Sequence, residues 1–257
     1  IKTNLRTHFI NFETMKKQFF YLLLLLLAFS ATAVAKAPQK AAAATVPADS
    51  LRVTIFGDSY STFYGWLSPA TNESWYFPAG HPGHVEGNDV TRVEETWWFQ
   101  VIQQMGYKLE MNNSYSGSTV GYYGYQNQNY QPRSFNTRVA NLGEPDLILS
   151  CCITNDSWTG ETLGDYKYAN WDENDMWYFR PAMARLCAAL RLNYPNARVL
   201  FILNTDLKPE FCESMRIICK HYGFPLLELH DIDKQVGHPS IAGHRAIAEQ
   251  VIDYLKK

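Results

Sequence analysis

A serine that follows a short apolar run is the first residue of this chain whose setting could support chemistry. Residues 53–56 form that run and predict a buried strand, and Gly57 permits a tight turn directly before Ser59. Ser59 is therefore expected just past the carboxyl end of a strand, where open α/β sheets build their sites. A serine hydroxyl becomes an effective nucleophile only when a base takes its proton. A histidine and donors for a developing oxyanion are thus required as well, because Gly-Asp-Ser alone is more typical of a polar turn.

Three further residues occupy equivalent positions after other predicted strands. Gly117, Asn155 and His238 follow apolar runs that end near residues 112, 153 and 229. The carboxyl ends of parallel strands share one edge of a sheet, so these residues and Ser59 are expected to converge there. A histidine base, a serine nucleophile and two donors are what acyl transfer requires.

The elements that must position these residues alternate between strand and helix. Strands are predicted at residues 52–56, 108–112, 146–153, 199–203 and 225–229, and helices are predicted to begin near Thr96, just before Pro181, at Pro209 and after Ser240. Such alternation indicates a parallel sheet covered by helices on both faces. We therefore predict an α/β fold, a three-layer α/β/α sandwich with about five parallel strands in one domain over residues 51–257.

The first fifty residues indicate a targeting signal rather than a folded domain. Met15 begins a segment in which two lysines precede the apolar run 19–29, and Ala33-Val34-Ala35 fits a signal-peptidase site. Residues 1–35 are thus predicted to be an N-terminal extension with a signal peptide, and residues 36–50 a flexible leader. The apolar run is shorter than the ~20 residues that span a bilayer. We expect a protein exported to the periplasm or the cell exterior, without stable membrane insertion after cleavage.

Charge and cysteine content argue against several classes of partner. The formal net charge is −2 and no run of Lys or Arg occurs, which argues against nucleic-acid binding. The five cysteines have no zinc-site spacing and are expected to be free, buried thiols. His81 and His84 lie in a turn-rich loop without a clear third ligand, so no metal site is expected. The sequence does not predict an oligomeric state.

Four ordered blocks resemble those of the SGNH, or GDSL-type, hydrolase family. They are Gly57-Asp58-Ser59-Tyr60-Ser61, then 113–119 with Gly117, then Thr154-Asn155-Asp156, and finally His238-Pro239-Ser240. The resemblance spans roughly residues 51–255 and implies a flavodoxin-like sheet and hydrolysis of esters through an acyl-Ser59 intermediate, without a cofactor. It further implies that His238 is the base and that the Gly117 amide and the Asn155 side chain form the oxyanion hole.

The sequence departs from the family pattern at two positions. The third block normally has glycine where this chain has Ile153, and a branched side chain there could crowd the oxyanion hole. The family usually places the triad aspartate three residues before the histidine, where this chain has Gln235. Asp233 is therefore the candidate for orienting His238, and Asp231, Gln235 or a backbone carbonyl remain alternatives.

Aromatic side chains suggest the kind of substrate. Several tryptophans lie in or beside the loops of the expected site edge, and aromatic rings pack against the C–H faces of sugars. Trp158, Trp97 and Asp58 are the candidates for contacting substrate. We expect an esterase that removes O-acetyl or similar short acyl groups from a carbohydrate. The alternatives are a lipid acyl hydrolase or lysophospholipase of the same family, and a non-catalytic glycan-binding protein on a degenerate hydrolase scaffold.

Overall fold

Five parallel strands form the centre of the computed structural model, which describes residues 51–257. The strands are β1 (Arg52–Gly57), β2 (Lys108–Asn112), β3 (Leu147–Cys151), β4 (Arg198–Leu203) and β5 (Leu226–Glu228). Their order in the sheet is β2-β1-β3-β4-β5, and every neighbouring pair is parallel. This is the flavodoxin-like order, so the predicted fold class is confirmed. The expected signal peptide and leader lie outside the described residues.

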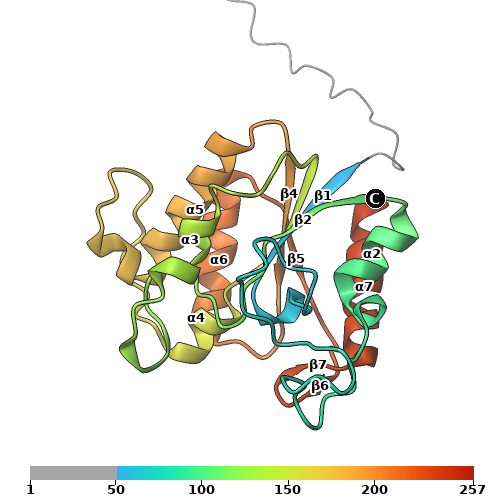
Figure 1. Ribbon diagram of the computed structural model, residues 1–257. Helices are drawn as coiled ribbons and strands as arrows, with labels where there is room; N and C mark the ends of the chain where they lie inside the picture. Colours follow the sequence, from blue (N-terminus) through green and yellow to red (C-terminus); the bar gives the residue numbers. More distant parts are fainter. Residues whose placement is uncertain (1–50) are drawn as a thin grey trace, which may run out of the picture. The chain divides into compact units, whose positions relative to one another are not determined.

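Helices cover both faces of this sheet. On one face lie α3 (Phe135–Arg138), α5 (Phe179–Asn193) and α6 (Pro209–Tyr222), and on the other lie α2 (Trp97–Met105) and α7 (Ile241–Leu255) (Figure 1). Each face has its own buried cluster. Phe56 and Ile148 point toward α5 and α6, whereas Val53 and Ile55 point toward α2 and α7. Alternate residues of a strand face opposite sides, so β1 contributes to both cores.

The predicted strands and long helices match the structure to within about two residues, and the short elements do not. The predicted third strand, 146–153, ends at Cys151 because the chain turns into the short helix α4 (Thr154–Thr159). Neither α3, α4 nor the two-stranded hairpin of β6 (Lys234–Gln235) and β7 (His238–Pro239) was predicted from the sequence. These elements are too short to show a hydrophobic period.

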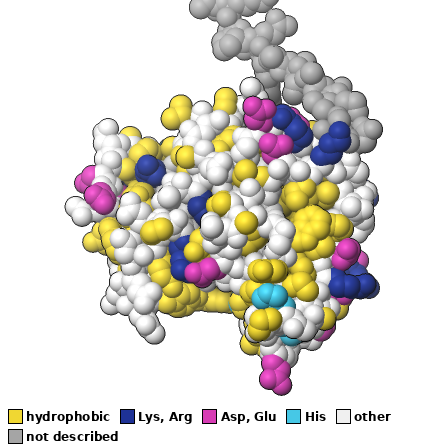
Figure 2. Space-filling model, in the orientation of Figure 1, with side chains coloured by type: hydrophobic (Ala, Val, Ile, Leu, Met, Phe, Trp, Pro, Cys, Tyr) yellow, Lys and Arg dark blue, Asp and Glu magenta, His cyan; other side chains and the backbone are white. Residues whose placement is uncertain are grey.

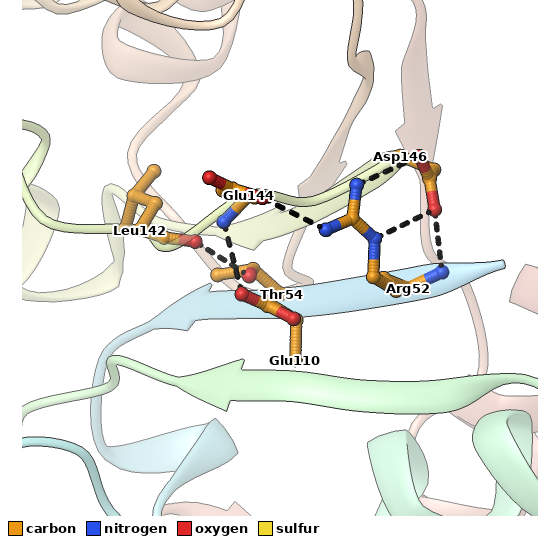
Figure 3. Close-up of polar contacts among 6 residues, drawn as sticks. All are labelled: Arg52, Thr54, Glu110, Leu142, Glu144 and Asp146. Atoms are coloured by element: carbon orange, nitrogen blue, oxygen red, sulfur yellow. Dashed lines mark hydrogen bonds and ion pairs between the residues drawn. The ribbon is translucent and has the colours of Figure 1, made fainter.

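Polar contacts fasten the amino-terminal edge of the sheet, away from the expected site. The amide of Arg52 donates to Asp146 Oδ2 over 2.9 Å, and its guanidinium contacts both Asp146 and Glu144 (Figure 3). Thr54 Oγ1 donates to the carbonyl of Leu142 over 2.8 Å. The Arg52 pairing keeps the pKa of Asp146 below its usual value. These contacts set the register between β1 and β3, and hence where Ser59 emerges at the opposite edge.

Residues 51–257 contain neither a membrane-spanning helix nor a cluster of metal-ligating side chains. No helix among residues 51–257 is both long and apolar enough to cross a bilayer. Within the same part of the chain, no group of three or more His, Cys, Asp or Glu side chains is arranged to hold a metal ion. All five cysteines lie in this part and are free; Cys212 is half-buried and the other four are buried.

Candidate active site

Ser59 begins a single 3-10 turn directly after β1. The turn (Ser59–Ser61) is capped by Asp58, whose Oδ1 accepts from the amide of Tyr60 over 3.0 Å. Gly57 is required by close packing, because a β-carbon there would lie 2.4 Å from Ser61 Oγ and 2.9 Å from Ser114 Oγ. The turn therefore projects the Ser59 side chain from a tightly packed strand end.

His238 reaches Ser59 from the β6–β7 hairpin. Its Nε2 lies 2.9 Å from Ser59 Oγ. Two tyrosines fix the hairpin in this place, since Tyr60 Oη donates to the carbonyl of Gly237 over 2.7 Å and Tyr76 Oη to that of Pro239 over 3.0 Å. The serine and the histidine are thus brought together from opposite ends of the domain.

The other imidazole nitrogen faces a backbone carbonyl. His238 Nδ1 lies 3.3 Å from the oxygen of Val236. A carbonyl oxygen can only accept, so Nδ1 carries the proton and Nε2 presents its lone pair to the Ser59 hydroxyl. This is the tautomer that a general base for Ser59 requires.

Aromatic rings enclose the imidazole. The indole of Trp75 stacks on it with ring centroids 3.6 Å apart and planes 9° apart. Tyr60 and Trp158 approach other parts of the ring, at centroid distances of 5.1 and 5.9 Å. Burial among these rings lowers the pKa of His238 to about 4. The imidazole is consequently neutral at physiological pH.

Gly117 and Asn155 lie on the second-strand and third-strand loops of the same edge. Gly117 has φ +75°, a conformation that favours glycine, and its amide donates to no other group of residues 51–257. The buried Asn155 side chain donates from Nδ2 to the carbonyl of Ser118 over 3.0 Å. The two loops are therefore tied to each other at the positions expected for oxyanion donors.

Comparison with known proteins agrees with this geometry. The family profile described as GDSL-like lipase/acylhydrolase matches residues 51–255. The chain belongs to this family.

Two solved structures of similar proteins come from Bacteroides. A protein of Bacteroides uniformis assigned to the GDSL-like lipases is 51% identical, with a TM-score of 0.78 over 80% of this chain and 96% of that one. One of Bacteroides ovatus with the same assignment is 47% identical, with a TM-score of 0.78 over 80% and 98% of the two chains. Their high identity over nearly their whole lengths agrees with the family assignment.

A more distant likeness concerns the fold alone. A family two carbohydrate esterase of Clostridium thermocellum is 17% identical, with a TM-score of 0.53 over 80% of this chain and 63% of that one. No curated protein sequence matches the chain. The match of the GDSL-like lipase/acylhydrolase profile to residues 51–255, and not this distant likeness, makes the chain an enzyme of a family of ester hydrolases.

The structure corrects the expectation for the third member of the GDSL triad. The carboxylate of Asp233 accepts a hydrogen bond from the hydroxyl of Ser240 and makes none to His238. Asp231 pairs with His230, and Gln235 pairs with Asp89, its Oε1 accepting from the Asp89 amide over 2.9 Å. Asp233 does not bind His238 because the Val236 carbonyl already occupies the position beside His238 Nδ1. The tight hairpin gives Val236 a φ of 52°, which turns its carbonyl to that position.

Two of the three residues expected to contact substrate are corrected as well. Asp58 is completely buried and caps the Ser59 turn, and burial raises the pKa of its carboxyl to about 6. Trp97 is also completely buried, and its indole donates to the carbonyl of Tyr60 over 3.2 Å. Both residues therefore support the Ser59–Ser61 turn from the interior of the domain. Trp158 is 39% exposed and lies edge-on to Tyr60 beside His238, so its expected contact with substrate stays a prediction.

Ile153 does not crowd the oxyanion loop. It adopts φ 71° and ψ −3°, the left-handed conformation that glycine enters without strain. Its side chain is completely buried in the cluster with α5 and α6. For a branched residue this conformation costs roughly 1–2 kcal/mol, which the burial of the side chain offsets. The backbone shape expected of the family's glycine is thus kept by a different residue.

Three residues that contact the site have roles that the sequence did not predict. Trp75 stacks on His238, Tyr125 donates to Asn155 Oδ1 over 2.9 Å, and the buried Arg138 donates to the carbonyl of Gly57 over 3.2 Å. Each contact joins segments far apart in the chain, so no local pattern could indicate it. The only available signal was that Trp75 and Tyr125 lie in loops expected above the site edge.

An ion pair between Arg133 and Glu73 lies on the surface beside the site. Arg133 donates to both carboxylate oxygens of Glu73, over 3.0 and 3.1 Å, and its guanidinium lies over the rings of Tyr115 and Tyr130. A β-carbon on Gly117 would lie 3.6 Å from Arg133 Nη1, which places this pair beside the oxyanion glycine. On the face drawn in Figure 2, basic and acidic side chains lie in small groups rather than in one charged patch.

Proposed function

We propose that this GDSL-like hydrolase uses Ser59 as its nucleophile and His238 as its base. The observation that carries the proposal is the 2.9 Å contact between Ser59 Oγ and His238 Nε2. The imidazole is neutral, and its proton is on Nδ1, which faces the Val236 carbonyl. The contact lies at the carboxyl edge of the sheet, and the Gly117 amide and the Asn155 side chain lie on loops of that edge.

The reaction follows from these positions. As Ser59 Oγ bonds to the ester carbonyl carbon, its proton passes to His238 Nε2, and the carbonyl becomes an oxyanion. The carbon–oxygen bond to the alcohol then breaks, and the alcohol leaves with the proton from Nε2. A water molecule attacks the acyl-Ser59 ester in the same way, giving its proton to His238. The carboxylic acid leaves and Ser59 regains its hydroxyl.

The oxyanion would be held by three N–H donors. They are the amides of Ser59 and Gly117, neither of which donates to another group of residues 51–257, and the second N–H of the Asn155 carboxamide. Losing one such donor typically lowers kcat by about 100-fold or more. The imidazolium formed during attack would be stabilised by the Val236 carbonyl and by the face of Trp75.

We propose short O-acyl esters, and O-acetyl groups on a carbohydrate in particular, as the substrates. Support comes from the mixed aromatic and polar surface beside Gly117, where Glu73 and Arg133 could bind sugar hydroxyls. Glu73 is also a wall of a hollow of about 470 Å³ that includes Tyr64 and Asn72. Sugar-binding sites combine ring faces with hydrogen-bonding groups in this way. The predicted export signal would bring the enzyme to such polymers.

The second candidate is a lipid acyl hydrolase. It is favoured by the assignment of the two Bacteroides relatives to the GDSL-like lipases. The ion pair of Glu73 and Arg133 beside the acyl site disfavours a long apolar chain at that place, because burying the pair under such a chain would remove water from both charges.

Hydrolysis of p-nitrophenyl esters by residues 51–257 tests both parts of the proposal. We expect the protein to hydrolyse the acetate, and Ser59→Ala and His238→Ala should each abolish this activity. Ser116→Ala should remain active, because the Ser116 hydroxyl makes no hydrogen bond within residues 51–257. The acetate should be cleaved faster than the octanoate, and acetylated oligosaccharides should release acetate.

Three outcomes would count against the proposal. Full activity of Ser59→Ala would exclude Ser59 as nucleophile. A preference for octanoate would favour the lipid enzyme. Binding of oligosaccharides without turnover of any ester would favour the non-catalytic glycan-binding protein.

A further inference from the structure

The carboxamide of Asn155 has a protein partner at each end. Its Nδ2 atom lies 3.0 Å from the carbonyl oxygen of Ser118, and its Oδ1 atom lies 2.9 Å from the hydroxyl oxygen of Tyr125. Asn155 itself is 2% exposed, so water does not compete freely for these atoms. Ser118 and Tyr125 both come from the long loop that follows β2, whereas Asn155 lies in α4 after β3.

These two partners fix which end of the amide is which. The Ser118 carbonyl can only accept, so the atom facing it must be the nitrogen. The oxygen of the amide then faces Tyr125, and the phenol must donate to it. One N–H of Nδ2 is used by Ser118, and the other makes no hydrogen bond within residues 51–257. An amide turned by 180° would set two acceptors, Asn155 Oδ1 and the Ser118 carbonyl, against each other.

Tyr125 is itself held in place by its loop. It begins a short turn (Tyr125–Asn127) in which Gln126 and Asn127 have φ values of 56° and 60°. The amide of Gly124 donates to the carbonyl of Gln128 over 2.9 Å, which closes the loop. Half-burial of the phenol raises the pKa of Tyr125 to about 12. The hydroxyl therefore keeps its proton throughout the ordinary pH range and can always donate.

We propose that Tyr125 is a positioning residue that orients the Asn155 amide as an oxyanion donor. The inference rests on the proposed function and adds a specific role for the loop after β2. Without the phenol, Oδ1 would lose its donor and the amide could rotate about the side-chain torsion. The free N–H would then point toward the developing oxyanion for only part of the time.

The test compares two tyrosines of the same loop. Tyr125→Phe removes one hydroxyl and keeps the ring that packs 6.3 Å from Tyr130. Tyr122→Phe is the matched control, because its hydroxyl makes no hydrogen bond within the described residues and its ring packs against Trp177, with centroids 6.2 Å apart, outside the proposed site. With p-nitrophenyl acetate we expect Tyr125→Phe to lower kcat about tenfold, a part of the loss from removing a donor outright. The KM of Tyr125→Phe, and both kcat and KM of Tyr122→Phe, should stay within twofold of the wild type.

A double-mutant cycle separates positioning from general support of the loop. In an Asn155→Ala background there is no amide to orient, so Tyr125→Phe should then change kcat by less than twofold. The proposal is wrong if Tyr125→Phe has wild-type kcat, or if it lowers kcat by the same factor with and without Asn155. Either result leaves the role of Ser59 untouched, whereas an active Ser59→Ala would reject the proposed function instead.

A measurement that needs no turnover addresses the same orientation. The side-chain amide of Asn155 should give two resolved proton signals in a ¹H–¹⁵N spectrum, assigned with Asn155→Ala. Tyr125→Phe is expected to shift and broaden both signals, and Tyr122→Phe to leave them in place. Unchanged Asn155 signals in Tyr125→Phe would overturn the proposal.

Discussion

The base of this site is oriented without a carboxylate. His238 is held at Nδ1 by the Val236 carbonyl, at Nε2 by Ser59, and across its face by Trp75. A neutral carbonyl stabilises an imidazolium less than a carboxylate does, and burial among aromatic rings disfavours the charge further. Burial lowers the pKa of His238, the positive charge of Lys234 lowers it further, and the hydrogen bond to the Val236 carbonyl opposes this only in part.

The low pKa predicts an unusual acid limit of activity. His238 must be neutral to accept the Ser59 proton, and its pKa lies near 4 instead of the usual 6.5. We expect kcat/KM to remain nearly level from pH 8 down to about pH 5 and to fall below pH 4. A pH profile with an acid-stable ester measures this. An inflection between pH 6 and 7 would show that His238 titrates normally and would contradict the geometry.

The role of Asp233 can be separated from that of a triad acid. Its carboxylate accepts a hydrogen bond from the hydroxyl of Ser240, the residue that caps the N-terminus of α7. Asp233→Asn keeps an oxygen for that contact, so we expect kcat to change less than threefold. Replacing a true triad aspartate by asparagine lowers kcat by about 10,000-fold. A loss of even a hundredfold, in a variant with unchanged Tm, would restore Asp233 as the group acting on His238.

Buried Arg138 connects the elements that carry the site. From the end of α3 it donates to the carbonyl of Gly57 at the end of β1, to Ser118 Oγ over 3.0 Å, and to the carbonyls of Asn113 and Arg133. Its guanidinium also lies over the rings of Phe56 and Phe135. The strand end before Ser59 and the loop of Gly117 are thus joined through one side chain.

Removing this charge should affect both stability and activity. Arg138→Met leaves the carbonyl oxygens of Asn113 and Arg133 without a donor among residues 51–257 and removes a positive charge that lowers the pKa of Asp58. We expect the free energy of unfolding to fall by about 3–5 kcal/mol, as for other broken buried polar networks. Urea denaturation measures this.

Arg138→Lys serves as the comparison for that experiment. We expect it to recover only part of the loss, because an ammonium cannot reproduce the forked contacts. Arg185→Met, whose guanidinium contacts Asn136 outside the site, is the matched control. A stability change below 1 kcal/mol in Arg138→Met would show that the network is unimportant.

The whole domain contains a buried acidic pair near the site. Asp156 and Glu161 are both buried, and three of their four oxygens have no hydrogen-bond partner within residues 51–257. Burial raises the pKa of both carboxyls above their usual values, and the neighbouring Asp156 raises the pKa of Glu161 further. A carboxyl whose pKa is higher in the folded state favours folding below its unfolded pKa, and this contribution is lost as the pH rises through the folded pKa.

Glu161→Gln should therefore stabilise the domain at alkaline pH. We expect its Tm to exceed that of the wild type above pH 7 and the difference to shrink toward zero below pH 4, where both carboxyls are neutral in both states. His238 and His244 act in the opposite sense, since burial lowers their pKa values and weakens folding in acid, but they are common to both proteins. Thermal melts from pH 3 to 9 measure the difference, and a Tm gain that is independent of pH would contradict this account.

The sequence by itself determined the sheet, its long helices and the edge at which the site lies. Continuous apolar runs and helical periods are local signals, and parallel strands necessarily place residues 59, 117, 155 and 238 at one edge. The four blocks were enough to predict the family, which the comparisons then confirmed. Ser59 and His238 were named together on that basis and lie in hydrogen-bond contact.

Only the tertiary structure decided how those residues are held. The Val236 carbonyl took the place expected for Asp233 because the two-residue strands of the hairpin turn the backbone there, and such turns are set by contacts with Tyr60, Tyr76 and Asn88. Trp97 could not be distinguished from Trp75 by residue type, yet one fills the core and the other stacks on the imidazole. Stacking, burial and amide orientation depend on neighbours distant in the chain, which is why local pattern could not reveal them.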